Sequence, residues 1–125
     1  MSTTSSKPPR AAENALWQAL EERRDLIRAI GPKFSERQHR YFRQAYAAGN
    51  LIAHLCGKMA NYKKGHNDRE YLEAMALLIK AGLPTWEHIL IREREPWTDY
   101  VTDEARRGAR QCIQDAIDYA HIGAR

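Results

Sequence analysis

The sequence predicts an all-α protein, a compact bundle of four to five helices with a loose N-terminal tail. Apolar residues recur at spacings of three and four along most of the chain, which is the period of an amphipathic helix. No segment alternates apolar and polar residues between hairpin turns, as strands do. With 125 residues, 43% of them hydrophobic, the chain is large enough to bury one core. We therefore expect a flexible tail at 1–9 and a single helical domain at 10–125.

The first helix is expected to begin at Pro9 or Arg10 and to end near Ile30. The residues before it are polar and have nothing to bury, so they form the tail. Gly31 and Pro32 then form a stop signal, because glycine accepts the left-handed conformation of a helix C-cap and proline cannot continue a helix.

The second helix is expected to begin at Ser35, because Ser35 and Gln38 have the spacing of a capping box. Apolar residues then follow at alternating spacings of four and three; they are Tyr41, Ala45, Ala48, Ile52, Leu55, Met59 and Tyr62. Such a seam predicts one long helix to about Tyr62, packed along a partner helix within the bundle or in a homodimer formed through residues 41–62. Gly49 weakens this helix slightly or admits a close helix crossing.

Three further helices are expected in the second half of the chain. The capping pattern at 67–70 starts a helix that runs to about Ala81, and Thr85 caps a short helix that Pro96 closes. Residues 96–101 form a turn or a short helical piece, and the last helix runs from Thr102 to about Ile122. One face of this helix carries small residues, so we expect it to lie centrally, close to neighbouring backbones. These residues are Ala105, Ala109, Cys112, Ala116 and Ala120.

The charge is unevenly distributed. Residues 1–65 carry 12 Lys and Arg against 5 Asp and Glu, a net of +7, whereas residues 66–125 carry 8 against 11, a net of −3. This asymmetry indicates an anionic partner for the first half. A basic face that only keeps the protein soluble, or that pairs with the acidic half, explains it equally well.

Six basic residues on the second helix and the connection after it are the candidate binding residues: Arg37, Arg40, Arg43, Lys58, Lys63 and Lys64. Guanidinium groups bind phosphates and carboxylates at two points, as a nucleic-acid interface requires. Aromatic residues are interleaved with them and could stack on unpaired bases or belong to the core. These are His39, Tyr41, Phe42, Tyr46 and Tyr62.

Sharper motifs fit poorly. Residues 71–94 have the order of a helix-turn-helix, but the second helix has no net positive charge. Two carboxylate-x-x-His pairs, at 36–39 and 118–121, lack the further carboxylates of a di-iron bundle. Cys56 and Cys112 fall on core-facing positions. No phosphate loop, nucleophile elbow or zinc motif is present, so we expect no metal, no cofactor and no enzymatic activity, with an unrecognised helical active site as the third alternative.

Trp97 and Tyr100 are the candidate residues for a protein interface, because exposed aromatic side chains often anchor interfaces. Packing of Trp97 onto the end of the bundle is the alternative. No apolar run approaches the length of about 18 residues that a membrane span requires, and the N-terminus has no apolar region of a signal peptide. With two cysteines, a cytoplasmic location without membrane contact is expected.

The sequence therefore predicts a non-catalytic helical binding or regulatory protein. Its basic face would engage nucleic acid or a nucleoprotein assembly, mainly through phosphate contacts. The alternative is a small inhibitor or adaptor that docks on a charged surface of a partner protein.

Overall fold

The computed structural model of the protein describes residues 7–30, 32–63 and 69–123. Within these residues the chain forms α-helices and one 3₁₀ turn, with no strand, so the predicted all-α fold is confirmed. The elements are α1 (Arg10–Glu22), α2 (Arg24–Ile30), α3 (Pro32–Ala47), α4 (Leu51–Ala60), α5 (Arg69–Lys80), α6 (Trp86–Leu90), η1 (Thr98–Tyr100) and α7 (Asp103–Gly123).

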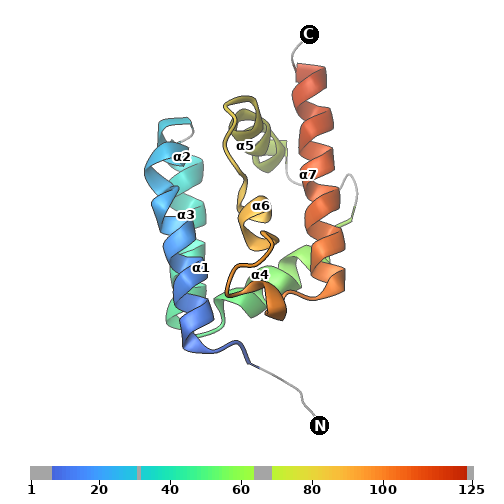
Figure 1. Ribbon diagram of the computed structural model, residues 1–125. Coiled ribbons are helices and arrows are strands. Elements are labelled where there is room, and N and C mark those ends of the chain that lie inside the picture. Colours follow the sequence, from blue (N-terminus) through green and yellow to red (C-terminus); the bar gives the residue numbers. More distant parts are fainter. Residues whose placement is uncertain (1–6, 31, 64–68, 124–125) are drawn as a thin grey trace.

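The helices form two walls with a middle layer between them (Figure 1). Helices α1, α2 and α3 make one wall, and α7 makes the other. Helices α5 and α6 lie between the walls, and α4 crosses below them. Helix α7 packs mainly against α4 and α5, as the small residues on its inner face predict. Ala105, Ala109 and Ala116 are completely buried there.

The predicted first helix is present but interrupted. Arg23 separates α1 from α2, and its N–H donates to the carbonyl of Leu20 at 3.3 Å in a tighter turn. Helix α2 continues upward from α1 in Figure 1, so the two form one arm of the wall. Neither glycine nor proline marks this interruption in the sequence.

The prediction of one long second helix is wrong, and so is the prediction that it begins at Ser35. Pro32 does not stop a helix but is the first residue of α3, a position that suits proline because its missing N–H has no partner there anyway. Ser35 therefore lies inside the helix. The helix ends at Ala47, and the chain turns at Gly49, which has a φ of +75°, before α4 begins at Leu51.

This turn changes what the apolar seam does. Ile52, Leu55 and Met59 are buried in the chain's own core on a separate helix, so residues 41–62 do not form the continuous surface on which the homodimer depended. Because the predicted first and second helices are each divided, the structure has more and shorter helices than the four to five expected.

A buried side chain from α1 caps the new helix. Glu13 is 1% exposed, and its two carboxylate oxygens accept hydrogen bonds from the backbone N–H groups of Leu51 at 2.7 Å and Ile52 at 2.9 Å. The first N–H groups of a helix have no partner within the helix, and the helix dipole favours a negative charge beside them. Glu13 therefore fixes where α4 starts and ties it to α1.

The remaining helices agree with the prediction. The cap residues expected before α5 lie outside the described residues, but α5 itself ends at Lys80. Thr85 caps α6 and forms a capping box with His88. The hydroxyl of Thr102 accepts from the N–H of Ala105 at 3.1 Å at the start of α7, and residues 98–100 form the short helical piece.

Helices α4 and α7 touch through their backbones. Gly108 is buried in α7, and a Cβ atom at this position would overlap the carbonyl oxygen of Met59 in α4. The absence of a side chain therefore sets the distance between these two helices. In the part of the chain that is described, no helix has the length and apolar character needed to cross a membrane.

Candidate functional site

The solvent face of α3 carries the predicted arginines. His39, Phe42 and Ala45 are buried on its inner face, so the helical period turns Arg37, Arg40 and Arg43 outward. All three are exposed. Their spacing of three residues spreads them over about a third of the helix circumference, centred on Arg40.

These arginines differ in their partners. Arg37 forms an ion pair with Glu70 at the start of α5. Arg40 and Arg43 form no ion pair with the described residues. Arg43 lies one turn after the buried His39 on the same helix, and its charge helps to lower the pKa of His39. Arg40 and Arg43 thus remain available to an external anion.

The predicted lysines also separate. The ammonium group of Lys58 lies 5.1 Å from the ring centre of Tyr41 and 5.1 Å from that of Tyr71, within the range of a cation–π contact. Lys63 is exposed just beyond α4. Lys64 lies outside the described residues. The structure therefore brings Lys58 beside α3 and leaves Lys63 at the far end of α4.

The stretch from Arg37 of α3 to Lys63 beyond α4 carries basic residues without acids. Between positions 37 and 63 the sequence has no Asp or Glu. Elsewhere, Arg28 pairs with Glu36 at 2.6 Å and Arg92 pairs with Glu95 at 2.9 Å, whereas Arg107 and Arg110 on α7 are exposed without an ion pair to the described residues. We call the surface that carries Arg37, Arg40, Arg43, Lys58 and Lys63 the basic face.

Most of the aromatic residues interleaved with the arginines belong to the interior. Phe42 is 2% exposed. Tyr46 lies between Trp17 and Arg10. The centre of the Tyr46 ring is 5.3 Å from that of the Trp17 ring and 4.1 Å from the guanidinium of Arg10. Tyr62 donates a hydrogen bond to Asp115 of α7. These contacts support the interpretation that the interleaved aromatics stabilise the fold, with one exception.

Tyr41 is the exception. It is half-buried and lines an open hollow of about 480 Å³ between α3 and α4. The exposed ring of His54 meets the Tyr41 ring edge-on, with centres 6.4 Å apart. Two asparagines and Lys58 complete the rim of this Tyr41–His54 hollow. A ring system, amide groups and a cation therefore lie together beside the basic face.

His39 is buried inside the wall, where its surroundings favour the neutral ring. Its ring packs on Trp17, with centres 4.9 Å apart, and its Nε2 lies 3.7 Å from Glu21. Burial lowers the pKa of His39, the charges of Arg24 and Arg43 lower it further, and Glu21 opposes them. Glu36, the other member of this carboxylate-x-x-His pair, is exposed and pairs with Arg28. Within the described ranges, no three His, Cys, Asp or Glu side chains are grouped to hold a metal ion.

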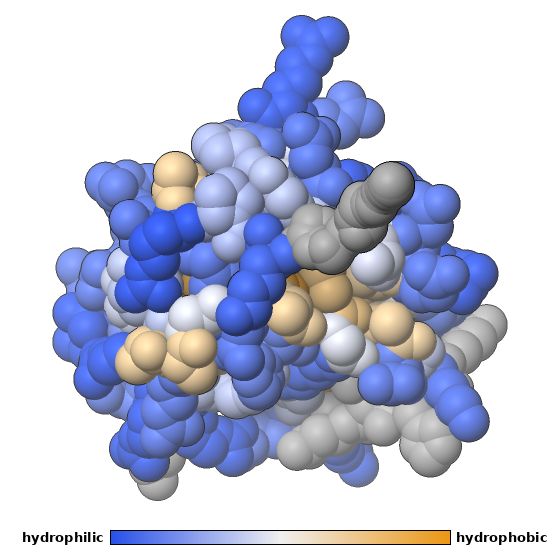
Figure 2. All heavy atoms as spheres, turned by 90° about the horizontal axis from the view of Figure 1, so that it is seen from below, coloured by the Kyte–Doolittle hydropathy of each residue, from blue (hydrophilic) through white to orange (hydrophobic). Residues whose placement is uncertain are grey.

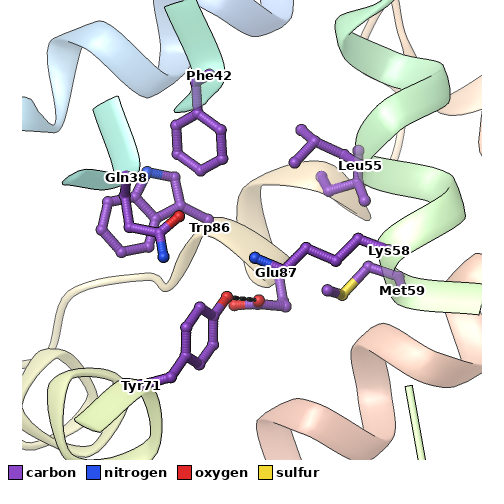
Figure 3. A pocket seen from close by; sticks show the side chains of 9 residues that line it. Gln38, Phe42, Leu55, Lys58, Met59, Tyr71, Trp86 and Glu87 are labelled. Carbon is purple, nitrogen blue, oxygen red and sulfur yellow. Dashed lines mark hydrogen bonds between the residues drawn. The ribbon is translucent and has the colours of Figure 1, made fainter. Parts of the chain in front are cut away.

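A second hollow holds a buried carboxylate that the sequence analysis missed. Figure 3 shows Glu87 and Tyr71 pointing toward each other below Lys58. Glu87 is 3% exposed, and its Oε2 accepts a hydrogen bond from the Tyr71 hydroxyl. Its Oε1 makes no hydrogen bond of ordinary geometry with the described residues. The signal was a glutamate next to Trp86 in a helix with three consecutive aliphatic residues.

Burial raises the pKa of Glu87 above its usual value. The Tyr71 hydroxyl, the Lys58 ammonium and Thr85 oppose this only in part. The hollow has room for about one water molecule, which suits a hydration site for Glu87 and not a substrate pocket.

The candidate interface residues are not equivalent. Trp97 is 2% exposed, and its Nε1 donates to the carbonyl oxygens of Ile89 and Leu90 at 3.2 and 3.0 Å. It therefore caps the end of α6 from inside the core and is not at the surface. Tyr100 is half-buried.

Tyr100 borders an apolar hollow on the underside of the molecule, together with Ile52 and Cys56. Figure 2 shows apolar side chains gathered in the middle of this otherwise hydrophilic face. Cys56 is a buried free thiol whose pKa is raised by burial, so it is a poor nucleophile. Cys112 is also a buried thiol, and its Sγ lies 3.6 Å from the Sδ of Met75.

The helix-turn-helix alternative is not supported. The element that would enter the major groove, α6, spans five residues. Its Trp86, Glu87, Ile89 and Leu90 are all buried. A recognition helix must expose one face to the bases, and α6 has none to offer.

Comparison with known proteins gives no match: no protein-family model matches the chain, and neither a curated protein nor a solved structure is significantly similar to it.

Proposed function

We propose that this protein binds nucleic acid through the basic face of α3 and α4. The observation that carries the proposal is the pair of exposed arginines, Arg40 and Arg43, which have no ion pair with the described residues and belong to a stretch, 37–63, that contains no Asp or Glu. An arginine without an internal partner keeps its guanidinium fork available for the two oxygens of a phosphate.

The contacts would be mainly to phosphates. Arg40 and Arg43 form the centre of the contact surface, Lys63 extends it along the chain, and Arg37 contributes after exchanging Glu70 for a phosphate. Side chains of this kind fix the position of a nucleic acid and carry little sequence information. The proposed binding is therefore salt-dependent and weakly specific.

The test is a titration of the nuclease-treated protein with fluorescent DNA and RNA, single- and double-stranded, at about 50 and about 200 mM salt. The double variant R40A/R43A should lower the affinity about tenfold at the lower salt concentration. It should also reduce the slope of log K against log salt by about two, because two phosphate contacts are lost.

The matched control is R107A/R110A. Both residues are exposed on α7, in the wall opposite α3 (Figure 1), so this variant loses the same charge elsewhere. An equal loss of affinity in both double variants would mean that net charge and not the basic face is responsible. If the wild-type protein binds no nucleic acid even at low salt, the proposal is wrong, and the alternative of an acidic protein partner is favoured.

A further inference from the structure

We infer that the Tyr41–His54 hollow accepts an unpaired base, so that the nucleic acid bound by the basic face is single-stranded. This inference rests on the proposed function and adds the class of nucleic acid to it. It follows from the aromatic side chain that the fold leaves beside the basic face.

The fold selects Tyr41 from the aromatic residues of α3. Phe42 and His39 are buried, and Tyr46 is covered by Trp17 and Arg10. Tyr41 alone of these four lines the hollow, which has a volume of about 480 Å³. That volume lies within the range of about 300–1,000 Å³ of pockets that hold small ligands.

The hollow combines the groups that hold a nucleotide. The Tyr41 ring supplies a stacking surface, and stacking is tolerant of sequence because every base has a π-face. His54 stands at about a right angle to it, with an angle of 83° between the rings, and is exposed. Asn50 and Asn61 also line the hollow, but the Asn61 amide donates to the carbonyl of Gly57 at 2.9 Å and the Asn50 Oδ1 is buried. The exposed His54 is therefore the group placed to hydrogen-bond the edge of a base.

Lys58 links the stacking surface to the phosphate backbone. Lys58 is an exposed residue, and its ammonium group lies 5.1 Å from the centre of the Tyr41 ring and 5.1 Å from that of Tyr71. A cation–π contact at an exposed site is weak, and the lysine side chain is flexible. A base can therefore replace the ammonium group on the ring, and the displaced ammonium group can pair with the phosphate of that nucleotide.

A duplex cannot use this hollow. Its bases cover one another's faces and offer only their edges in the grooves, whereas stacking on Tyr41 requires a free face. The charge around the hollow does not distinguish the two forms, because phosphates are present in both. A higher affinity for the single strand than for the duplex therefore measures the contribution of the Tyr41 ring.

The test compares Tyr41→Leu with the wild-type protein. Leucine keeps an apolar side chain against Phe42 and removes the π-face. We expect its affinity for an unstructured single strand of about 16 nucleotides to fall about tenfold, with an unchanged salt slope and an unchanged affinity for the duplex of the same sequence. Tyr41→Phe keeps the ring and should bind like the wild type. Tyr119→Leu, on α7, is the matched control and should also have no effect.

The outcomes separate the two proposals. If the wild type binds with a steep salt dependence but Tyr41→Leu binds the single strand equally well, the base site is wrong and the proposed function stands. An equal loss for single strand and duplex also overturns the base site. If the wild type binds neither, both proposals fail.

A second variant protects the test from a folding defect. His54 is exposed, so His54→Ala leaves the core intact, and it should weaken single-strand binding about threefold without affecting the duplex. A single strand carrying 5-iodouracil should also cross-link to Tyr41 or His54 under ultraviolet light. Cross-links confined to residues outside the hollow would contradict the inference.

Discussion

Glu13 and Glu87 are both almost completely buried, at the junctions of α1 with α4 and of α5 with α6, but their surroundings differ. Both oxygens of Glu13 accept hydrogen bonds from backbone N–H groups at the start of a helix. Among the described residues, only one oxygen of Glu87 accepts a hydrogen bond of ordinary geometry, from Tyr71, and burial raises the pKa of Glu87.

The difference shows that burial alone does not determine what a carboxylate contributes. Moving a charge out of water costs free energy unless donors replace the water. The backbone donors at Glu13 have no other partner, so each side satisfies the other. Around Glu87 there are fewer hydrogen-bond donors than its two carboxylate oxygens can accept. We therefore expect the first junction to depend on its charge and the second to tolerate its loss.

The largest effect is expected for Glu13→Ala. Two buried backbone N–H groups would lose their acceptor, and the free energy of unfolding should fall by about 3 kcal/mol. Denaturant unfolding followed by circular dichroism measures this change. Glu22→Ala, an exposed glutamate on the same helix, is the control and should change it by less than about 0.5 kcal/mol. An equal fall in the free energy of unfolding in both variants would contradict the capping role of Glu13.

A smaller effect is expected for Tyr71→Phe. This change removes the hydroxyl donor and leaves Glu87 buried, so the free energy of unfolding at neutral pH should fall by about 1–2 kcal/mol. Tyr119 donates to the exposed Glu73 at 3.1 Å, and Tyr119→Phe therefore gives a matched control at the surface. If Tyr119→Phe lowers the free energy of unfolding as much as Tyr71→Phe does, burial does not increase the contribution of the tyrosine–glutamate hydrogen bond.

The smallest effect is the pH dependence of Glu87. Because its pKa is raised in the folded protein, the folded state binds the proton more tightly than the unfolded state. Stability from this group is therefore present at pH values below the unfolded pKa of 4.5 and is lost as the pH rises through the folded pKa. The unfolding free energy of the wild type minus that of Glu87→Gln should decrease over this range.

This subtraction isolates Glu87 from the histidines. The pKa values of His39 and His88 are lowered by burial, so their effect has the opposite sign: stability falls as the pH drops below the unfolded value of 6.5. Both histidines are present in both proteins, and their contributions cancel to first order. A difference that does not change with pH would mean that Glu87 titrates normally.

The sequence predicted the fold class because helical periodicity survives local interruptions. Ile52, Leu55 and Met59 keep their spacing and are buried on α4 as expected, although α4 is a separate helix. The turn at Gly49 changes the direction of the chain, so that α4 crosses below α5 and α6, without changing which residues are apolar. Periodicity therefore identifies the buried residues and does not show whether one helix or two carry them.

The helix junctions could not be predicted, because their causes are distant in sequence. Glu13 is separated from its partners at the start of α4 by 38 and 39 residues. In the sequence it is one of several acids on the first helix. Likewise, Arg37 belongs to the predicted basic residues, but only the fold shows that it pairs with Glu70. Charge and spacing selected the candidate residues, and the tertiary structure decides which of them are available.

The contact between Gly108 and Met59 predicts an unusual pattern of mutational tolerance. At position 108 every other amino acid adds a Cβ atom that overlaps the opposite backbone, so a library of all single substitutions should retain glycine almost exclusively. Met59 contributes its carbonyl to that contact, and the carbonyl is the same in any residue. Its side chain can therefore be replaced by leucine at little cost. The strictest selection in this protein should thus fall on a position that has no side chain at all.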